Sequence, residues 1–593
     1  MAHISAALAS NSQLWGDRGV WHCDGRRALS GRALHAAAAR LSAALSARLG
    51  CRPGDRVALL GLNTPEYLVA LLAATDAGAL ACPLNWRWSD AELAAALALV
   101  APAVVCVDAA CEALLAAAAR RPGCPPFPVV RLAPVGGALG DAAAGRQPAA
   151  GRPTHDMAPL LQPAGAAAQA ELQLLRPPCG GALIVFTSGT TSTPKGAVLA
   201  HTALLHQSMA KLAVVGYSAR DSYLHAAPLC HIGGLSSALA ALLAGAQHVF
   251  MPRYSPADTA RLVRRHRVTA LIAVPAMVED LLALGAEGEG AGDGSAPAPG
   301  ASAGSLPSVL RVLVGGGGMR PAVAGLVVRL FPNAVVSTAY GMTEAASSIT
   351  FLCPAARTAA EPGGSSNSAP SGVCVGAPAP GVQVAIAAPT ADGPNGLCGE
   401  RPLPLSASSP GPSPVGEVLT RGPHVMAGYW QDPEQTQKAL LPDGWLRTGD
   451  LGALDAAGRL WLVGRAKDTV RSGGENVHAA EVEAALEQHP AIAAAAVVGL
   501  PHSRLGEMVA AAVVLRPGWA WREELGGSTA TNAAAGGRRL VTPAELQQHC
   551  RAAGLTAFKL PRRVAVLAEL PRNSSGKVVK PAVKQALLTR SAL

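Results

Sequence analysis

The stretch FTSGTTSTPKG, residues 186–196, gathers groups that together could hold a polyphosphate. Its glycines would let backbone amides point into a concavity, its Ser and Thr hydroxyls add donors, and its lysine adds a compact positive charge. It differs from the P-loop pattern G-x-x-x-x-G-K-[ST], because the lysine here precedes the glycine, as PKG. A Ser/Thr-rich surface turn is the alternative, which we disfavour for so ordered a string. The stretch therefore predicts an anion-binding loop.

A strand must present this loop, and the rest of the chain indicates the fold that supplies it. The apolar run GALIV comes directly before the loop, and similar short runs alternate with helical patterns through the first two thirds of the chain. Strands that alternate with helices predict βαβ units and mainly parallel sheets. From Gly464 the pattern changes to strand, glycine turn, helix and strand. We expect an α/β protein with a large N-terminal domain, residues 1–466, and a smaller mobile α+β domain, residues 467–593, with a hinge at Lys467.

The composition agrees with two domains. At 593 residues the chain exceeds the roughly 250–300 at which a single core stops growing. Half of the residues are apolar and 15% are charged, which argues against global disorder. The formal net charge of +10 is spread along the chain, so it favours small anions as ligands and does not indicate nucleic-acid binding. Four segments rich in Gly, Ala, Pro or Ser are assigned as loops or insertions: residues 285–308, 361–371, 388–414 and 526–539.

The cysteines and the apolar runs bear on the compartment. The twelve cysteines are scattered without any C-x-x-C pair, which predicts reduced thiols in an intracellular protein. The apolar stretch at residues 93–107 is shorter than the ~20 residues of a membrane span, and it contains Pro102. The stretch at residues 222–252 contains Pro228, histidines and a Gly-Gly pair, and we interpret it as buried strand, loop and helix. We therefore expect no transmembrane segment.

The loop at residues 186–196 resembles the phosphate-binding signature TSGTTGxPKG of the adenylate-forming superfamily, which includes acyl-CoA synthetases and peptide-synthetase adenylation domains. Ser192 stands where that signature has glycine, and a positive φ there would cost serine roughly 1 kcal/mol. Further motifs of the superfamily follow in the same order along the chain. The resemblance implies that the loop holds the phosphates of ATP through Thr187, Ser188, Gly189, Thr190, Thr191 and Lys195.

STAYGMTE, residues 337–344, resembles the adenine and magnesium segment of the same superfamily. The resemblance implies that Tyr340 lies along the adenine, next to Gly341, and that Thr343 contacts the α-phosphate. It also implies that Glu344 binds Mg²⁺, and a carboxylate oxygen does suit this hard cation. An acid that stabilises a helix N-terminus is the alternative for Glu344.

Three short motifs resemble the elements around the nucleoside. RTGD, residues 447–450, places Asp450 where it could accept hydrogen bonds from both ribose hydroxyls, as acidic residues do in other nucleotide sites. GRAKD, residues 464–468, places Arg465 near the ribose, and GGGG, residues 315–318, resembles the turn beside the adenine through Gly316 and Gly317. Taken singly, TGD could be a turn and GGGG a flexible linker, so the weight rests on their joint order.

The C-terminal part carries motifs for a second step. NSSGKVVK, residues 573–580, has Lys577 at the position of the superfamily's catalytic lysine, with one more solvated lysine as the alternative. SGGENV places Gly473 and Gly474 on the face implied to meet CoA, and Lys467 takes the hinge position. The resemblance implies that ATP and the acid form an acyl-adenylate and pyrophosphate. The small domain then rotates about Lys467, and the CoA thiol displaces AMP.

The identity of the acid is suggested by four segments: residues 83–89, 227–249, 339–351 and 550–563. They resemble the subfamily of plant-type 2-succinylbenzoate–CoA ligases, which act in phylloquinone synthesis on an aromatic keto-diacid. Such a pocket needs apolar walls, donors for the second carboxylate and small residues. We expect it at His231, Gly233, Ser236 and Ser347. His231 could equally be a loop histidine satisfied by backbone, and Ser347 a buried hydroxyl bonded to the preceding turn.

Three alternatives stay open at this point. The enzyme could be a CoA ligase for another aryl or medium-chain acid, a non-catalytic adenylate-binding relative, or a carrier-loading adenylation domain, although no carrier segment follows Lys577 in this sequence. We expect ATP, Mg²⁺ and CoA as cofactors and co-substrates, and the sequence does not indicate an oligomeric state. The C-terminal Ser591, Ala592 and Leu593 form a weak variant of the peroxisomal SKL signal. With the resemblance, this suggests chloroplast, peroxisome or both.

The position of Lys577 gives a first prediction. Lys577→Ala should reduce adenylation, measured as acid-dependent pyrophosphate release, by about 10²–10³, because a preorganised charge at the α-phosphate is lost. Thioester formation from a supplied acyl-adenylate should be spared, since this lysine should face the nucleotide only in the first step. Equal loss in both half-reactions would remove Lys577 from the adenylation site.

Overall fold

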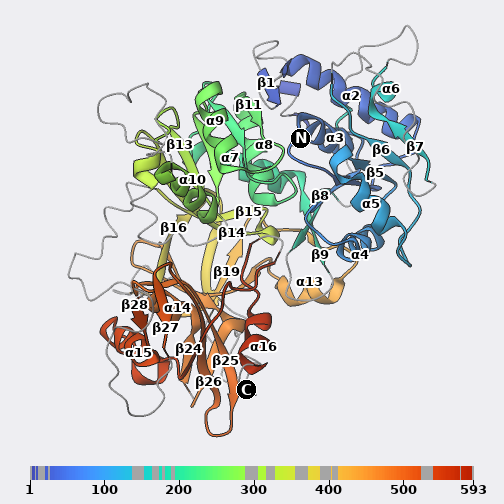
Figure 1. Ribbon diagram of the computed structural model, residues 1–593. Helices are drawn as coiled ribbons and strands as arrows, with labels where there is room; N and C mark the ends of the chain where they lie inside the picture. Colours follow the sequence, from blue (N-terminus) through green and yellow to red (C-terminus); the bar gives the residue numbers. More distant parts are fainter. Residues whose placement is uncertain are drawn as a thin grey trace. The chain divides into compact units, whose positions relative to one another are not determined.

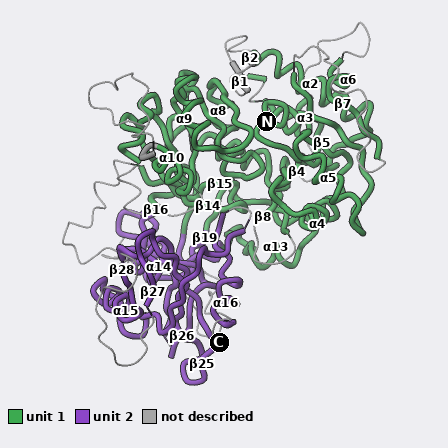
Figure 2. The backbone as a smooth tube through the Cα atoms, viewed as in Figure 1, with its two compact units in different colours: residues 1–365, 375–384, 420–447 green, residues 366–374, 385–419, 448–593 purple. Residues whose placement is uncertain are grey.

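The protein is described by a computed structural model (Figure 1). Its described residues are 3–6, 9–10, 20–23, 27–135, 152–162, 173–175, 180–187, 194–287, 305–315, 327–353, 372–387, 402–403, 412–473, 475–522, 539–573 and 576–589. The chain divides into two compact units (Figure 2). Unit 1 comprises Met1–Ser365, Val375–Val384 and Thr420–Arg447, and unit 2 comprises Ser366–Cys374, Ala385–Leu419 and Thr448–Leu593. The hinge at Lys467 and the domain boundary between residues 466 and 467 stay predictions.

The first sheet of unit 1 is a βαβ-built sheet that ends in the hairpin of the predicted loop. Helix α3 (Pro65–Asp76) connects β3 to the parallel β4; the hydroxyl of Thr64 caps it by accepting from the Tyr67 amide, and every residue of α3 is buried. The sheet order is β20-β9-β8-β4-β3-β5-β6-β7, with β9 antiparallel to both neighbours. The strands are β3 (Arg56–Leu60), β4 (Leu80–Leu84), β5 (Val104–Val107), β6 (Val129–Arg131), β7 (Thr154–Asp156), β8 (Gly181–Thr187), β9 (Lys195–Ala200) and β20 (Gly428–Tyr429).

The second sheet of unit 1 has a parallel centre and an antiparallel margin. The parallel strands are connected by α8 (Ile232–Ala244), α9 (Pro256–His266) and α10 (Pro275–Glu287), which Figure 1 shows in green beside α7 (His201–Val214). Its order in this unit is β16-β15-β14-β13-β12-β10-β11-β1-β2. The strands are β1 (Val20–Cys23), β2 (Arg27–Ser30), β10 (Ser222–His225), β11 (Gln247–Phe250), β12 (Ala270–Ala273), β13 (Arg311–Val314), β14 (Val335–Met342), β15 (Ser347–Leu352) and β16 (Val373–Pro378).

Burial explains why these sequences form these elements. The parallel strands β10 and β12 are buried along their whole length, as the continuous apolar runs of a covered parallel sheet require. Helix α8 is apolar around most of its surface and is buried from Gly234 to Leu242. It ends at Gly245, whose φ of 73° is a left-handed conformation that glycine adopts without strain.

Unit 2 contains a smaller, mainly antiparallel sheet, in which β29 alone of the strands named below pairs in parallel, and helices pack against it. Strand β26 lies between β25 and β23 and also pairs with β29, and β23 and β24 form a hairpin. Apolar residues of α14, α15 and this sheet share one core. The elements are β23 (Thr469–Ser472), β24 (Glu475–His478), α14 (Ala479–Glu487), β25 (Ile492–His502), β26 (Gly506–Leu515), α15 (Pro543–Ala552), β29 (Arg563–Val566) and α16 (Lys580–Thr589).

Further strands precede this sheet along the chain. Strands β21 (Leu446–Leu454) and β22 (Leu460–Arg465) are antiparallel, and so are β17 (Gln383–Ala387) and β18 (Pro402–Leu403). The division between the units falls within β16, β17, β21 and β19 (Gly416–Arg421). A short parallel pair, β27 (Trp519–Trp521) and β28 (Arg539–Val541), flanks the segment that contains most of the fourth predicted insertion.

The expected fold class is confirmed, with differences in detail. The predicted βαβ order appears in both sheets of unit 1. The C-terminal part has one more strand than we expected, because the glycine turn at Gly473 joins two strands, β23 and β24, before helix α14. Helix α10 extends to Glu287, into the first predicted insertion, and β18 lies in the third. Residues 361–371 lie outside the described residues.

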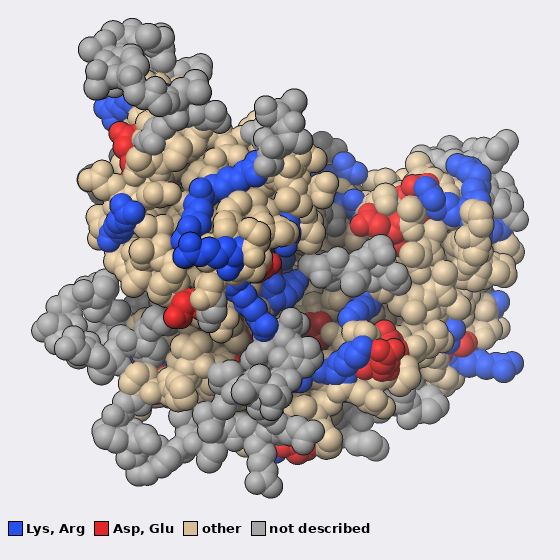
Figure 3. All heavy atoms as spheres, turned by 90° about the horizontal axis from the view of Figure 1, so that it is seen from below, with Lys and Arg blue, Asp and Glu red and all other residues tan. Residues whose placement is uncertain are grey.

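The distribution of surface charge and the state of the cysteines agree with what the composition predicts. On the face drawn in Figure 3, blue Lys and Arg and red Asp and Glu side chains are interspersed with uncharged surface. The cysteines whose side chains the structure describes are free thiols, and most of them are buried. Among the described helices, none combines the length and the hydrophobicity that a membrane span requires.

Candidate active site

The two strands that flank the predicted phosphate loop form a hairpin. Strand β8 ends at Thr187 and β9 begins at Lys195, and these two residues are paired. A side chain is excluded at Gly196, because a Cβ there would lie 2.6 Å from Cγ2 of Ile184. The structure therefore places both ends of the loop. Residues 188–193 lie outside the described residues, and with them the predicted Ser188, Gly189, Thr190 and Thr191 as well as Ser192.

Lys195 is oriented by a segment far along the chain. Its Nζ donates to Oε1 of Gln435 at 2.6 Å and lies 5.4 Å from the centre of the Tyr429 ring. Gln435 lies in α13 (Pro433–Ala439), and Tyr429 in β20, which pairs with β9. An aromatic face attracts an ammonium group through its quadrupole. Because both partners are neutral, the positive charge of Lys195 stays available to a phosphate.

Tyr429 also contacts the predicted magnesium ligand. Its hydroxyl donates to Oε1 of Glu344 at 2.7 Å, and the Glu344 carbonyl accepts from the Met426 amide. Burial, followed by the neighbouring Glu344 carboxylate, raises the pKa of Tyr429 well above its usual value, so the phenol stays protonated and donates. Glu344 itself is 8% exposed. One tyrosine thus links the lysine of the loop to the glutamate of the STAYGMTE motif.

The turn that carries Glu344 is defined by a close backbone approach. Thr343 and Glu344 lie in a short 3-10 helix between β14 and β15, and Tyr340 and Gly341 lie at a bulge near the end of β14. A Cβ on Gly341 would lie 1.6 Å from the carbonyl oxygen of Ser347, so only glycine fits there. After Glu344, Ala346 and Ser347 both have positive φ, 49° and 126°. Such strained conformations persist only where the surrounding structure enforces them.

Two of the four predicted acyl-pocket residues meet at a lysine. Nζ of Lys211, in α7, donates to the hydroxyls of Ser236, in α8, at 2.9 Å and Ser347 at 3.3 Å. The other two lie at the start of α8, where His231 is the residue before the helix and Gly233 follows in its first turn. A Cβ on Gly233 would have no atom within 4 Å, so this turn faces open space.

Lys211 is fully buried, and its partners among the described residues do not include a carboxylate. In the part of the chain that the structure describes, its polar partners are the two serine hydroxyls and Oε1 of Gln207, at 3.4 Å, and all three are neutral. Burial lowers the pKa of Lys211 from 10.5 to about 7. A buried ammonium that lacks a counter-ion loses its hydration without compensation. This lysine therefore lowers the stability of the fold at neutral pH.

Gln207 fixes helix α7 to the turn after Glu344. Its Nε2 donates to the carbonyls of Ser348, at 2.6 Å, and Ala345, at 3.2 Å, and its Oε1 accepts from the Ser348 amide at 3.2 Å. Gln207 is fully buried. A buried side-chain amide with all of these bonds made positions the groups around it.

The predicted ribose residues of unit 2 contact each other. Asp450 and Arg465 are paired between β21 and β22, and Nε of Arg465 lies 3.0 Å from Oδ1 of Asp450. The amide of Asp450 donates to the hydroxyl of Thr448 at 3.1 Å. An acidic group paired in this way is held in one orientation while it retains acceptor capacity. The motifs predicted both residues at the ribose, and in the structure their side chains contact each other.

The remaining predicted residues of unit 2 lie in turns. Lys467 lies in the short helix Ala466–Asp468, between β22 and β23. Gly473 has a φ of 63° in the β23–β24 turn, and Gly474 lies outside the described residues. Lys577 is exposed, and its amide donates to Oδ1 of Asn573 at 2.9 Å, which closes the turn of the NSSGK motif. Gly316 and Gly317 also lie outside the described residues.

The residues present suit a magnesium ion that is bound together with a nucleotide. Glu344 offers a carboxylate, of which the hydrogen bond from Tyr429 occupies one oxygen. Within the described residues no cluster of three or more His, Cys, Asp or Glu could hold a metal alone. Magnesium is usually held by one or two carboxylates together with phosphates and waters.

Comparison with known proteins decides the family. Residues 8–430 match the family of AMP-binding enzymes, and residues 481–577 match the AMP-binding enzyme C-terminal domain. The chain belongs to the AMP-binding enzyme family. The resemblance inferred from the motifs is thereby confirmed, and the protein is an AMP-forming acid–CoA ligase that uses ATP and CoA.

Three similar proteins illustrate the range of acids within this family. The AMP-binding enzyme described here is 34% identical to the chloroplastic/peroxisomal 2-succinylbenzoate–CoA ligase of Arabidopsis thaliana, over 95% of this chain and 93% of that protein. It is 32% identical to the indoleacetate–CoA ligase of Aromatoleum aromaticum, over 93% and 92%. Its structure is similar to that of the o-succinylbenzoate CoA synthetase of Bacillus subtilis in complex with the acyl-adenylate intermediate, with a TM-score of 0.72, 26% identity and coverage of 98% and 97%.

Sequence reasoning missed Lys211, Gln207 and Tyr429. On α7 the buried residues include Leu204, Gln207, Ser208 and Lys211, which follow the i, i+3, i+4, i+7 spacing of a helix face turned to the core. That spacing could have identified Lys211 as a buried charge. Tyr429 carries no comparable local pattern, because its contacts depend on the pairing of β20 with β9.

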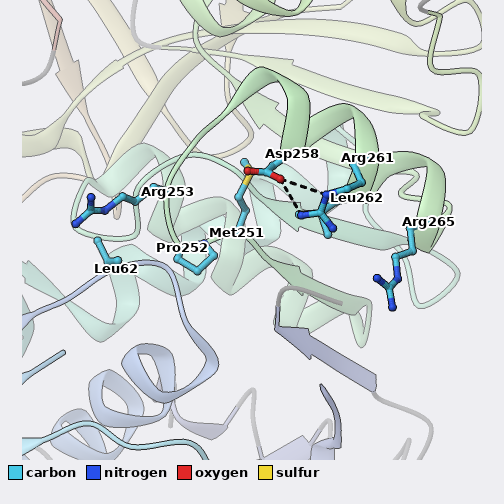
Figure 4. Close-up of a pocket in the computed structure, with 8 residues that line it drawn as sticks. All are labelled: Leu62, Met251, Pro252, Arg253, Asp258, Arg261, Leu262 and Arg265. Atoms are coloured by element: carbon cyan, nitrogen blue, oxygen red, sulfur yellow. Dashed lines mark hydrogen bonds and ion pairs between the residues drawn. The ribbon is translucent and has the colours of Figure 1, made fainter. Parts of the chain in front are cut away.

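A basic pocket of about 520 Å³ lies elsewhere in unit 1 (Figure 4). Arg253, Arg261 and Arg265 line it, and Asp258 binds Arg261 by hydrogen bonds to Nε, at 3.2 Å, and Nη2, at 2.8 Å. Figure 4 shows Arg253 and Arg265 on either side of that pair. None of the predicted site residues lines this pocket.

The close approach at Gly341 gives a second prediction. Gly341→Ala should lower the melting temperature of this AMP-binding enzyme by several degrees, because a Cβ at 1.6 Å forces β14 and β15 apart. The measurement is a thermal melt of purified variant and wild type. Gly315→Ala is the matched control for stability, since its Cβ would meet an atom only at 4.0 Å. Equal melting temperatures for both variants would contradict the described hairpin.

The buried Lys211 gives a third prediction, on stability and pH. Its folded pKa, about 7, lies below the ordinary 10.5, so between these values the unfolded state binds more protons. The free energy of unfolding of the wild type should therefore contain a term from Lys211. This term should rise with pH over this window, by at most about 1.4 kcal/mol per pH unit. Lys211→Met removes the term, so the variant should be more stable than wild type at neutral pH.

The check is urea unfolding of both proteins in parallel across this pH range. The stability advantage of Lys211→Met should be largest at or below pH 7 and should shrink toward pH 10.5. Contributions from buried cysteines and tyrosines are common to both proteins and cancel in the difference. A difference that does not change with pH would mean that Lys211 titrates at its ordinary pKa.

Proposed function

We propose that this AMP-binding enzyme converts 2-succinylbenzoate, ATP and CoA to 2-succinylbenzoyl-CoA, AMP and diphosphate. The observation that carries the proposal is the 34% identity, over nearly the full length of both chains, with the Arabidopsis 2-succinylbenzoate–CoA ligase. The similarity to the Bacillus subtilis o-succinylbenzoate CoA synthetase supports it. The product would serve phylloquinone synthesis, and we propose the chloroplast, the peroxisome or both as the location.

In the first half-reaction a carboxylate oxygen of the acid attacks the α-phosphorus of ATP, and diphosphate leaves. Two anions must meet, so the enzyme has to hold them in line and neutralise charge. Lys195 and the loop from Thr187 would hold the outer phosphates, and Thr343 the α-phosphate. The bonds from Gln435 and Tyr429 support this role, because they orient Lys195 without neutralising it. Lys577 would supply charge at the α-phosphate.

The nucleoside and the metal would be held by residues of several of the family motifs. Tyr340, Gly341, Gly316 and Gly317 would line the adenine, and Asp450 with Arg465 the ribose. Glu344 would hold Mg²⁺ together with the phosphates, and the ion would supply Lewis-acid neutralisation of their charge. Tyr429 supports Glu344 in this role, because its hydrogen bond fixes the orientation of the carboxylate.

In the second half-reaction the CoA sulfur attacks the acyl carbonyl carbon. The thiol proton is lost, and AMP leaves with the electrons of the bond between the carbonyl carbon and the phosphate oxygen. We propose that residues 467–593 rotate about Lys467 between the two steps, which withdraws Lys577 and brings Gly473 and Gly474 toward CoA. The exposure of Lys577 in its turn agrees with a side chain that enters and leaves a site.

A second candidate function is CoA ligation of another aryl acid. The indoleacetate–CoA ligase of Aromatoleum aromaticum supports it, because it matches this chain at 32% identity over a similar length. The two candidates differ in charge, since 2-succinylbenzoate has a second carboxylate and indoleacetate has none.

The choice of acid gives a fourth prediction. 2-Succinylbenzoate should be used far better than benzoate, succinate, indoleacetate or fatty acids, measured as CoA-dependent AMP release across this panel. A site that satisfies a second carboxylate leaves its donors unpaired with a mono-acid, and such mismatches discriminate by about 10⁴–10⁵. One methylene in an apolar pocket gives only about 10–200-fold.

Ring substitutions that keep both acids should have shallow effects in the same assay. A mono-acid that equals 2-succinylbenzoate in kcat/KM would overturn the proposed substrate and leave the acid–CoA ligase activity in place. The Lys577→Ala variant serves as the background control. Its AMP release should stay low with every acid of the panel, because its adenylation rate is reduced.

A further inference from the structure

We propose that Lys211 is a specificity-determining residue, whose ammonium group binds the carboxylate of the acid substrate that does not react with ATP. The inference rests on the proposed function, because it requires a substrate with two carboxylates. It assigns the selection of a diacid to one side chain on helix α7, which the motifs of the family did not indicate.

The position of Lys211 supports this role. Its Nζ contacts Ser236 of α8 and Ser347 of the turn that follows Glu344, and both serines belong to the predicted acyl pocket. The hydroxyl of Ser347 can also donate, so Lys211 and Ser347 together could bind one carboxylate, whereas the hydroxyl of Ser236 donates to the Gly233 carbonyl. Ser236 lies within 3.4 Å of the carbonyl of Gly233, whose missing side chain leaves open space beside it.

The chemistry of the contacts is unusual for a structural lysine. Buried charges in folded proteins are normally paired or hydrogen-bonded to opposite charges. In this unit, buried Asp221 has such a partner, because Nη1 of Arg311 lies 2.7 Å from its Oδ1. The described partners of Lys211 are instead three neutral side-chain oxygens. The group that would complete the site is an anion.

The stability cost of Lys211 points in the same direction. Burial without a counter-ion lowers the pKa of this lysine to about 7, and an apolar residue of similar length would avoid the cost. Active sites are often locally destabilised as a cost of their function, which agrees with a binding role for this lysine. A carboxylate bound at Nζ would restore the charged form, so the substrate would pair with a lysine that the protein alone leaves incomplete.

The shape of 2-succinylbenzoate fits this assignment. The carboxylate that becomes the acyl-adenylate must reach the α-phosphate, on the side of Thr343 and Glu344. The other carboxylate must lie away from the phosphates, because like charges repel. Ser347 and Glu344 lie in one turn, and the hydroxyl of Ser347 contacts Lys211. Residues of one short turn would therefore lie near both carboxylates of the substrate.

The test compares two acids on two variants. The acids are 2-succinylbenzoate and 4-oxo-4-phenylbutanoate, which keeps the chain and the ring and lacks the ring carboxylate. The variant is Lys211→Met, which keeps the length of the side chain and removes its charge. The matched control is Ser208→Ala on the same buried face of α7, where the bond of the hydroxyl among the described residues stays within the helix, to the Leu204 carbonyl. Thermal melts check that each variant folds.

We expect Lys211→Met to lower kcat/KM for 2-succinylbenzoate by about 10²- to 10³-fold, because the substrate carboxylate loses its buried partner. Turnover of 4-oxo-4-phenylbutanoate should change by less than about threefold, since that acid has no group at Nζ. Ser208→Ala should keep the wild-type preference. A change in the ratio between the acids identifies charge recognition, which a packing role of Lys211 would not produce.

Three outcomes would overturn the inference. The first is an unchanged preference for the diacid in Lys211→Met, and the second is an equal loss for both acids, which indicates a structural role. The third is a wild-type enzyme whose best substrate is a mono-acid, which overturns the proposed function as well. If the best substrate is a different diacid, the proposed function fails alone, and the same comparison with its analogue lacking the second carboxylate decides on Lys211.

Discussion

The hydrogen bonds of the Gln207 side chain are the interaction on which the described part of the site depends. They join helix α7 to the turn between β14 and β15, through the carbonyls of Ala345 and Ser348 and the amide of Ser348. That turn contains two strained residues, and it is held against Gly341 by a backbone contact that admits no side chain. Without Gln207 the turn would lose three hydrogen bonds to α7 and keep the one that Nζ of Lys211 donates to the Ser347 hydroxyl at 3.3 Å. The positions of Glu344 and Ser347, at the two ends of this turn, therefore share the support of these hydrogen bonds.

The lysine and the aspartate buried in unit 1 show two different uses of charge. Asp221 is paired with Arg311 and also accepts from the hydroxyl of Thr269, so its carboxylate is satisfied within the fold. Lys211 has neutral partners, and its burial costs stability. Pairing within the fold makes a charge structural, whereas incomplete pairing keeps it available to a ligand. The contrast separates a residue that maintains the sheet from one that can select a substrate.

Local patterns predicted the elements, and long-range pairing determined what they could not. The apolar run GALIV predicted the strand before the loop, and the resemblance of RTGD and GRAKD to family motifs predicted Asp450 and Arg465, which the β21–β22 pairing brings to 3.0 Å. Tyr429 could not be predicted, because it reaches Lys195 and Glu344 only through a strand paired across more than two hundred residues of sequence. The glycine turn at Gly473 was predicted, but not that the residues after it form a strand. The helical spacing of α7 was sufficient to predict that Lys211 is buried, whereas its contact with Ser347 depends on the long-range packing of α7 against the turn.

Helix α8 carries one residue that borders open space, Gly233, and another that contacts a charge, Ser236. Gly233 faces open space in an ordinary helical conformation, so a larger residue there would reduce the room for a substrate without straining the backbone. One turn further, Ser236 contacts the ammonium of Lys211. If this region binds the acid as proposed, bulk and charge would be controlled at different residues. An ancestral ligase of this architecture could exchange one acid for another by single substitutions on α7 and α8, while its nucleotide chemistry passed unchanged to its descendants.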